Sequence, residues 1–285
     1  MKLIGLVACI VLMSGCAKVL FTTANTATLG FDGEIVEDIA YGDMPRQTLD
    51  MFVPAKQDLD NREFPVVVFF HGGRWTFGDK SQYQFVGTRL AEMGYVVVIP
   101  NTRLYPEVKF PTFVEDAAKA VAWAFEQTGQ YGGNGEVFLT GHSSGAHIAA
   151  LVTANPAYLE AHDISSHRIS GFAGMAGPYD FEPKEDDLKD MFGPPERYPE
   201  MAVTTFISGD EPPMLLMYSN NDETVHITNL RKLESAIKQH DGTVKTIIYE
   251  GGGHAGTVAA LSWANPAGLP VANDLNAFFQ SVLSR

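Results

Sequence analysis

Three side chains, far apart in the sequence, could together activate a serine hydroxyl for attack on a carbonyl group. Ser143 lies in the pentapeptide Gly141-His142-Ser143-Ser144-Gly145, between an apolar strand-like run and a helix-like run. This strand–turn–helix context is typical of a nucleophile elbow, where a strained turn exposes the serine and glycines allow the backbones to pack closely. Taken alone, the pentapeptide would also suit a glycine- and serine-rich loop that caps a helix.

A serine hydroxyl becomes a nucleophile only when a base takes its proton and an acid orients that base. Asp222 follows a strand-like run over 213–219, and His254 follows a second such run over 244–249, within a glycine-rich stretch. The order Ser, Asp, His and the position after parallel strands both match a nucleophile-elbow hydrolase. We therefore predict Ser143 as nucleophile, Asp222 as acid and His254 as a base that a flexible loop carries to the serine.

Other residues compete for these roles. Asp222 could simply cap the helix that follows it, and Glu223 and Asp210 are alternative acids. His254 could be an ordinary loop histidine. His142, inside the elbow, is expected to support the site and contact substrate, whereas His147 on the elbow helix is expected to be packed in the core.

A second glycine-rich turn, His71-Gly72-Gly73-Arg74-Trp75, follows the first buried strand. Glycines at such a turn let backbone N–H groups face a substrate carbonyl, and the N–H of Ser144 should supply another donor. We predict an oxyanion hole made by Gly72, Gly73 and Ser144. Arg74 and Trp75 are expected either to line the substrate pocket or to pack beneath the turn.

The rest of the sequence predicts the elements that position these residues. An antiparallel hairpin over 34–41 and 47–53 is followed by apolar strands that alternate with amphipathic helices, which indicates an α/β class fold with a mostly parallel central sheet and helices on both faces. The segment 177–213 is rich in Pro, Asp and Glu and is expected to be a long loop or a small lid over the site.

The N-terminal residues are expected to direct export of the protein and not to be part of the folded domain. Residues 1–15 have the charge, apolar run and small residues of a signal peptide. Met13-Ser14-Gly15-Cys16 resembles the bacterial lipobox, which implies lipidation of Cys16, attachment to a membrane, and an outer-membrane location facing the periplasm or the cell surface. A plain signal peptide with an incidental cysteine is the alternative. Residues 16–30 are expected to form a tether, and 31–285 the catalytic domain.

Composition excludes some classes of partner and site. The 285 residues carry a formal net charge of -14, which argues against nucleic acid, since binding phosphates needs clustered Lys and Arg. The sequence contains neither an H-E-x-x-H motif nor a Cys/His cluster, so we expect no metal and no cofactor.

From Pro65 to the C-terminus the chain resembles the α/β-hydrolase superfamily, in the esterase branch with hormone-sensitive-lipase-like, BD-FAE-like and kynurenine-formamidase-like enzymes. The resemblance implies the roles assigned above to Ser143, Asp222 and His254. One departure is Arg74, which replaces the third glycine of the lipase-type motif. The matching residues are His71-Gly72-Gly73-Arg74-Trp75 with Gly78-Asp79-Lys80, Arg103-Leu104-Tyr105-Pro106, Phe110-Pro111 with Asp116, Gly141-His142-Ser143-Ser144-Gly145-Ala146-His147, Pro212-Pro213 with Asp222 and Val225, and His254.

The resemblance implies a carboxylesterase that cleaves short-chain esters through an acyl-enzyme on Ser143, with a small-molecule ester as its partner. An arylformamidase-like or other small-amide hydrolase is the alternative, because both groups share these motifs. A non-catalytic binding protein on the same scaffold is a further alternative, since a fold does not determine a function.

Overall fold

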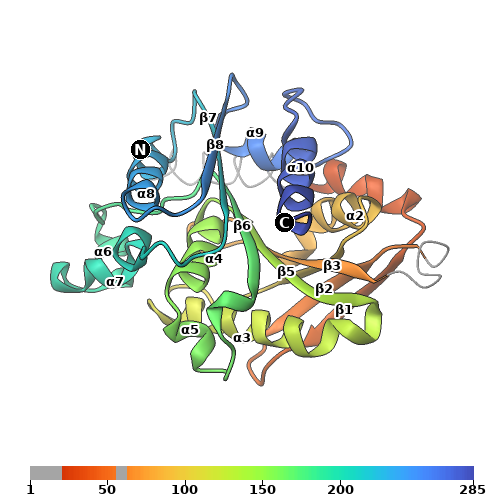
Figure 1. Ribbon diagram of the computed structural model, residues 1–285, viewed down its shortest axis with the longest axis horizontal. Helices are drawn as coiled ribbons and strands as arrows, with labels where there is room; N and C mark the ends of the chain where they lie inside the picture. Colours follow the sequence, from red (N-terminus) through yellow and green to blue (C-terminus); the bar gives the residue numbers. More distant parts are fainter. Residues whose placement is uncertain (1–20, 56–62) are drawn as a thin grey trace, which may run out of the picture.

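The computed structural model describes residues 21–55 and 63–285. Its centre is an eight-stranded sheet with the order β1-β2-β4-β3-β5-β6-β7-β8 (Figure 1). The first two strands pair antiparallel with each other and β2 with β4, and all later pairs are parallel. The strands are β1 Glu34–Ala40, β2 Thr48–Val53, β3 Phe64–Phe70, β4 Val96–Pro100, β5 Gly133–His142, β6 Ile169–Met175, β7 Met214–Ser219 and β8 Val244–Tyr249.

The central strands form because their apolar runs are buried on both faces of the sheet. β4 is completely buried, and in β3 every residue but Pro65 is buried, which is the expected pattern for a strand covered by helices on both sides. Val66, Val67 and Val68 of β3 lie opposite Val96, Val97 and Val98 of β4. The predicted α/β fold with its N-terminal antiparallel hairpin is confirmed.

Helices cover both faces of the sheet (Figure 1). Apolar side chains of α2 and α10 pack with one face, and those of α3, α4, α5 and α8 pack with the other. The helices are α2 Gln84–Glu92, α3 Thr112–Gln127, α4 Ser144–Ala154, α5 Ala157–Glu160, α6 Asp186–Phe192, α7 Tyr198–Met201, α8 Thr228–Gln239, α9 Gly253–Ala259 and α10 Val271–Leu283, with short 3-10 helices between several of them.

The segment predicted as a tether differs from expectation in its second half. Residues 21–25 are helical and Thr26–Gly30 form a 3-10 helix. Asn25 donates to the Ser81 carbonyl at 2.8 Å and accepts from the Phe85 amide at 3.1 Å, while the Phe21 ring lies 5.2 Å from that of Tyr83. These contacts seat residues 21–30 on the domain. The predicted signal peptide and Cys16 lie outside the described residues, so membrane attachment stays a prediction.

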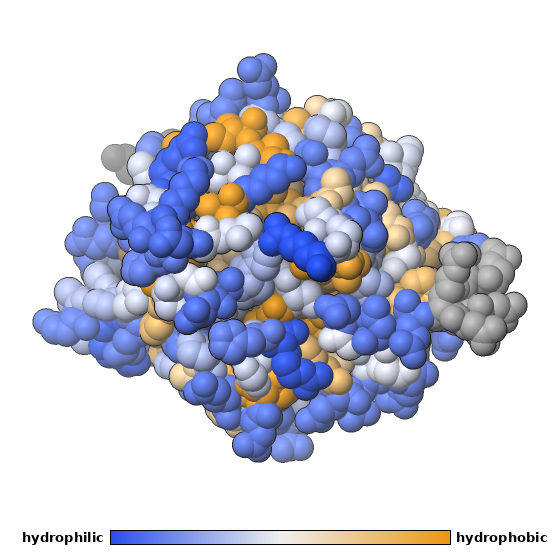
Figure 2. Space-filling view, viewed as in Figure 1, coloured by the Kyte–Doolittle hydropathy of each residue, from blue (hydrophilic) through white to orange (hydrophobic). Residues whose placement is uncertain are grey.

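One face of the molecule is largely hydrophilic. Hydrophilic residues cover most of the face shown in Figure 2, and hydrophobic residues occur in separate areas between them. Among the helices formed by the described residues, none is both long enough and apolar enough to cross a bilayer.

The segment 177–213 lies at the edge of the site and is not one continuous loop. It contains α6 and α7 and two 3-10 helices, Pro195–Arg197 and Val203–Phe206. Leu188, Met191 and Phe192 of α6 are buried, which fixes one face of that helix against the domain.

Candidate active site

The elbow is the sharp turn between β5 and α4. Ser143 adopts φ 55° and ψ −125°, a conformation that costs a non-glycine residue free energy and occurs where the surrounding structure enforces it. A Cβ on Gly145 would lie 2.1 Å from the Phe70 carbonyl oxygen, and a Cβ on Gly141 would lie 2.6 Å from the Gly145 carbonyl carbon. Only glycine fits at these two positions, because strand and helix backbones touch there.

The structure brings Ser143, His254 and Asp222 into one hydrogen-bonded chain. His254 Nε2 lies 2.8 Å from Ser143 Oγ, and His254 Nδ1 lies 2.8 Å from Asp222 Oδ2. The Asp222 side chain is 1% exposed and that of His254 is 18% exposed. The neighbouring Glu223 is exposed, so Asp222 is the carboxylate that reaches the histidine. This geometry suits proton transfer from the serine to a histidine held in one tautomer.

Asp222 is held as a carboxylate. Burial works to raise its pKa, but hydrogen bonds from His254 and from the amides of Val225 and Thr224 outweigh burial and lower that pKa below its ordinary value. The two amides donate to Asp222 Oδ1, each at 2.9 Å, while Oδ2 faces His254. One carboxylate therefore both closes the loop after β7 and orients the histidine.

The prediction that His254 lies in a loop is wrong. His254 lies in the first turn of α9, which begins at Gly253. Positive φ values at Gly251, Gly252 and Gly253 turn the chain into this helix. The histidine is therefore carried by a helix end and is more firmly placed than a flexible loop would allow.

His142 contacts His254 through a hydrogen bond and through its ring. Its Nε2 donates to the His254 carbonyl oxygen at 2.9 Å, and the two rings lie 4.8 Å apart. Burial, followed by the nearby His254, lowers the pKa of His142 to about 3, so the ring is neutral. His142 is not among the residues that line the cavity above Ser143, and its contact with substrate stays a prediction.

The turn predicted as an oxyanion hole lies against the nucleophile. A Cβ on Gly72 would lie 3.3 Å from Ser143 Cβ and 3.0 Å from His142 Nδ1. Gly73 has φ +135°, and a Cβ there would collide with the Phe77 carbonyl oxygen at 1.9 Å. Ser144 is the first residue of α4, where N–H groups have no partner within the helix. The Gly72 backbone and the start of α4 therefore lie next to Ser143, and the oxyanion hole stays a prediction.

A cavity of about 300 Å³ opens above the nucleophile. The segment 177–213 supplies six of its lining residues, so this part of the chain forms part of the cavity wall. Thr224 and Val225, which follow Asp222 closely in the sequence, also line the cavity. The lining residues are Arg74, Trp75, Ser143, Ser144, Pro178, Phe181, Glu182, Lys184, Glu185, Leu188, Thr224, Val225, His226 and Asn229.

Arg74 and Trp75 both line this cavity, but each is held by the protein. The Trp75 side chain is buried, stacks on Phe181 at 5.7 Å and meets Phe192 edge-on at 5.0 Å. Arg74 forms two hydrogen bonds with Asp187 of α6. His147 is packed in the core, as predicted, with its Nε2 2.8 Å from the Met201 carbonyl oxygen.

Two asparagines that sequence reasoning did not identify join the loop of the acid to the loop of the base. Asn220 Oδ1 accepts from the Gly251 amide at 3.0 Å, and Asn221 Oδ1 accepts from the Gly253 amide at 2.8 Å. The Ser219 hydroxyl also donates to the Gly251 carbonyl. Polar residues immediately before a predicted catalytic acid were the only available signal for these contacts.

Within residues 21–55 and 63–285, no group of three or more His, Cys, Asp or Glu side chains is arranged to hold a metal ion.

The parallel sheet, the elbow and the order of the three residues along it define a protein of the α/β-hydrolase fold. A family model, BD-FAE, matches residues 49–237. The chain belongs to the BD-FAE family.

Curated relatives include longer proteins described as probable esterases. The chain is 28% identical over 246 residues to a probable isoprenylcysteine alpha-carbonyl methylesterase, ICME, of Oryza sativa subsp. japonica, covering 79% of this chain and 59% of that protein. It is 28% identical to the probable carboxylic ester hydrolase LipM of Mycobacterium tuberculosis, covering 71% and 51%. The chain thus spans between half and three fifths of the length of these two relatives.

Solved structures share the fold over nearly the whole chain. A truncated carbohydrate esterase from gut microbiota superimposes with a TM-score of 0.76 at 17% identity, covering 90% of this chain and 98% of that chain. Esterase B from Lactobacillus Rhamnosis superimposes with a TM-score of 0.74 at 20% identity, covering 94% and 96%.

Proposed function

We propose that this protein is a carboxylic ester hydrolase that uses Ser143, His254 and Asp222 as its catalytic residues. The observation that carries the proposal is the unbroken hydrogen-bonded chain from Asp222 through His254 to Ser143, which lines a cavity. Family membership and similarity to esterases support the same class of reaction.

In the proposed reaction, Ser143 Oγ attacks the ester carbonyl carbon while His254 Nε2 takes the serine proton. Asp222 holds His254 in the tautomer that leaves Nε2 free to accept and stabilises the imidazolium that forms. The amides of Gly72, Gly73 and Ser144 stabilise the negative charge on the carbonyl oxygen. The His254 proton then passes to the leaving alcohol, and water releases the acyl group from Ser143 by the same route.

The size and lining of the cavity support short acyl chains. At about 300 Å³ the cavity is at the small end of ligand sites. Trp75, Phe181, Leu188 and Val225 give it apolar walls, and burial of an acyl chain against them provides the driving force for binding. We expect turnover to fall as the acyl chain lengthens beyond the space that these walls enclose.

The test is hydrolysis of p-nitrophenyl esters from C2 to C12 by a chain starting at residue 17, with Ser143→Ala as the matched variant. The expected result is fastest turnover on C2–C4 esters and loss of that turnover in the variant. Activity that survives in Ser143→Ala would reject Ser143 as the nucleophile. If the intact protein hydrolyses aryl formamides or small amides but no ester, the ester proposal is wrong.

A further inference from the structure

The turn that carries Gly72 and Gly73 is strained and needs external support. Gly73, Arg74 and Trp75 all have positive φ, with values of 135°, 52° and 60°. Positive φ is unfavourable for a non-glycine residue, so two such residues in a row persist only where neighbours hold them. The amides of Thr76 and Phe77 donate to the Gly73 carbonyl at 2.9 and 3.0 Å and close the turn from inside.

Arg74 connects this turn to a segment more than 100 residues away. Its guanidinium donates from Nη1 to Asp187 Oδ2 and from Nη2 to Asp187 Oδ1, the latter at 3.2 Å. Glu185 lies 3.8 Å away and adds a weaker contact. Two parallel bonds between a guanidinium and a carboxylate fix orientation as well as distance. Asp187 also accepts from the Leu188 amide at 2.9 Å, which in turn fixes the carboxylate.

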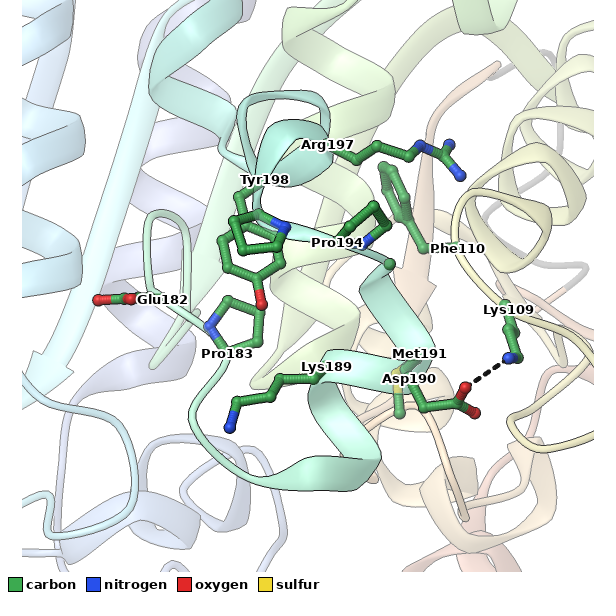
Figure 3. A pocket seen from close by; sticks show the side chains of 12 residues that line it. Lys109, Phe110, Glu182, Pro183, Lys189, Asp190, Met191, Pro194, Arg197 and Tyr198 are labelled. Atoms are coloured by element: carbon green, nitrogen blue, oxygen red, sulfur yellow. Dashed lines mark hydrogen bonds and ion pairs between the residues drawn. The ribbon is translucent and has the colours of Figure 1, made fainter.

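Asp187 belongs to α6, which lies between two cavities. On one side is the cavity above Ser143. On the other side is a second cavity of about 540 Å³, which Met191 and Asp190 of α6 line together with Phe110 and Tyr198 (Figure 3). Apolar packing holds only the buried side chains of α6. Polar contacts of its aspartates attach the helix further to the domain.

One of those contacts provides a natural comparison. Asp190, one turn after Asp187, accepts from Lys109 Nζ at 2.6 Å, as drawn in Figure 3, and from Tyr105 Oη at 2.9 Å. Asp187 and Asp190 both attach α6 to the domain through a cation, but only Asp187 bonds to a side chain of the turn next to Ser143. Asp190 reaches that turn only indirectly, through Tyr105, whose amide donates to the Trp75 carbonyl at 2.9 Å. Comparing a substitution of Asp187 with one of Asp190 therefore distinguishes attachment of α6 from support of the turn.

We propose that Asp187 is a positioning residue: acting through Arg74, it holds the Gly72–Gly73 turn so that its amides face the carbonyl oxygen of a substrate at Ser143. The proposal rests on the proposed ester hydrolysis. It also assigns a role to the arginine that replaces the third glycine of the related motif, because a side chain at this position can reach α6 whereas glycine cannot.

The test is steady-state hydrolysis of p-nitrophenyl butyrate by Asp187→Asn, which keeps the shape of the side chain and removes its charge. Oxyanion donors act mainly in the transition state, so loss of alignment should lower kcat more than it changes KM. We expect kcat to fall about tenfold, less than the 10²- to 10³-fold typical for removing a whole donor. KM should stay within twofold.

A second readout separates support of the turn from general loosening. Butylboronic acid binds to a catalytic serine as a tetrahedral anion that resembles the charged intermediate. Its inhibition constant should therefore rise with Asp187→Asn by about the same factor as kcat falls. Arg74→Lys keeps the charge but loses the two parallel bonds, so it should show the same loss. The double variant Arg74→Lys/Asp187→Asn should lose little more than either single variant, because both break one contact.

The controls are Asp190→Asn and Asp186→Asn. Asp186 neighbours Asp187 and lies 3.6 Å from Lys189, an ion pair that does not involve the turn. Both controls should keep kcat within twofold. Equal losses in Asp187→Asn and Asp190→Asn would mean that α6 merely needs attachment, and an unchanged kcat in Asp187→Asn would overturn the proposal. Failure of the unsubstituted protein to hydrolyse any ester would instead reject the proposed function.

Discussion

Two buried histidines make the stability of this protein depend on pH well above the range where carboxylates titrate. His142 and His147 are fully enclosed, and burial lowers their pKa values from 6.5 to about 3 and about 4. The unfolded chain exposes both rings and returns them to their ordinary pKa. Between those values the unfolded state therefore binds protons that the folded state does not, and lowering the pH favours unfolding.

The size of the effect follows from the shifts. The ordinary pKa of 6.5 lies 1.5 units above pH 5, so both rings are protonated there in the unfolded chain. The pKa values in the folded protein lie about one unit or more below pH 5, so both rings stay neutral there. At about 1.4 kcal/mol per unit, each histidine should cost roughly 2 kcal/mol between pH 7.5 and pH 5, or roughly 4 kcal/mol together. That is a large part of the 5–15 kcal/mol that a typical domain has. Burial also lowers the pKa of His71, which acts in the same direction.

The assay is urea unfolding followed by tryptophan fluorescence at several pH values between 7.5 and 5. His147→Gln removes the titrating ring and keeps an N–H donor for the Met201 carbonyl. We expect this variant to lose about 2 kcal/mol less than the unsubstituted protein over the same pH range. Substitution of the exposed His167 by Gln is the control and should leave the pH dependence unchanged. Equal pH dependence in His147→Gln and the unsubstituted protein would refute the reasoning.

Three further predictions concern the site and its support. Asp222→Asn should lower kcat for p-nitrophenyl butyrate by about 10³-fold or more, because the amide favours the wrong tautomer of His254; a loss below tenfold would argue for another acid. Gly72→Ala places a methyl group 3.0 Å from His142 Nδ1 and 3.3 Å from Ser143 Cβ, so kcat should fall at least about tenfold while urea unfolding changes little; full activity would mean that the turn yields freely. Lys80→Met removes the cation that lies 2.6 Å from Asp50, whose side chain is 1% exposed. The free energy of unfolding should then fall by about 3–5 kcal/mol, and a melting temperature within two degrees of the original would contradict a structural role for this pair.

Features that depend on local pattern could be predicted from the sequence. The strand-like runs over 213–219 and 244–249 match β7 and β8 to within one residue. The match for β7 has a simple cause, since a strand buried on both faces cannot contain many polar side chains. The glycines around Ser143 indicated the elbow, since close contact between strand and helix excludes any side chain at Gly141 and Gly145.

Features that depend on long-range contacts left no such pattern. Asp187 and Arg74 are 113 residues apart, and an aspartate on an exposed helix face resembles any solubilising charge. The contact between His142 and His254 uses a backbone carbonyl, which every residue possesses. The start of α9 was missed because three consecutive glycines predict a loop, although their positive φ values are what direct the chain into the helix. Residues 21–30 were assigned as a tether because their composition does not reveal the contacts of Phe21 and Asn25.

The loop after β8 is hydrogen-bonded to Ser219, Asn220 and Asn221, and this has a consequence for engineering the protein. These bonds make the structure of the segment that carries Asp222 depend on the segment that carries His254, although about thirty residues separate them in sequence. A loop graft or recombination that replaces one segment alone would leave its partner's amides and carbonyls unmatched. Crossover points that keep 219–225 and 250–257 from the same parent should preserve activity in chimaeras, whereas points between them should not.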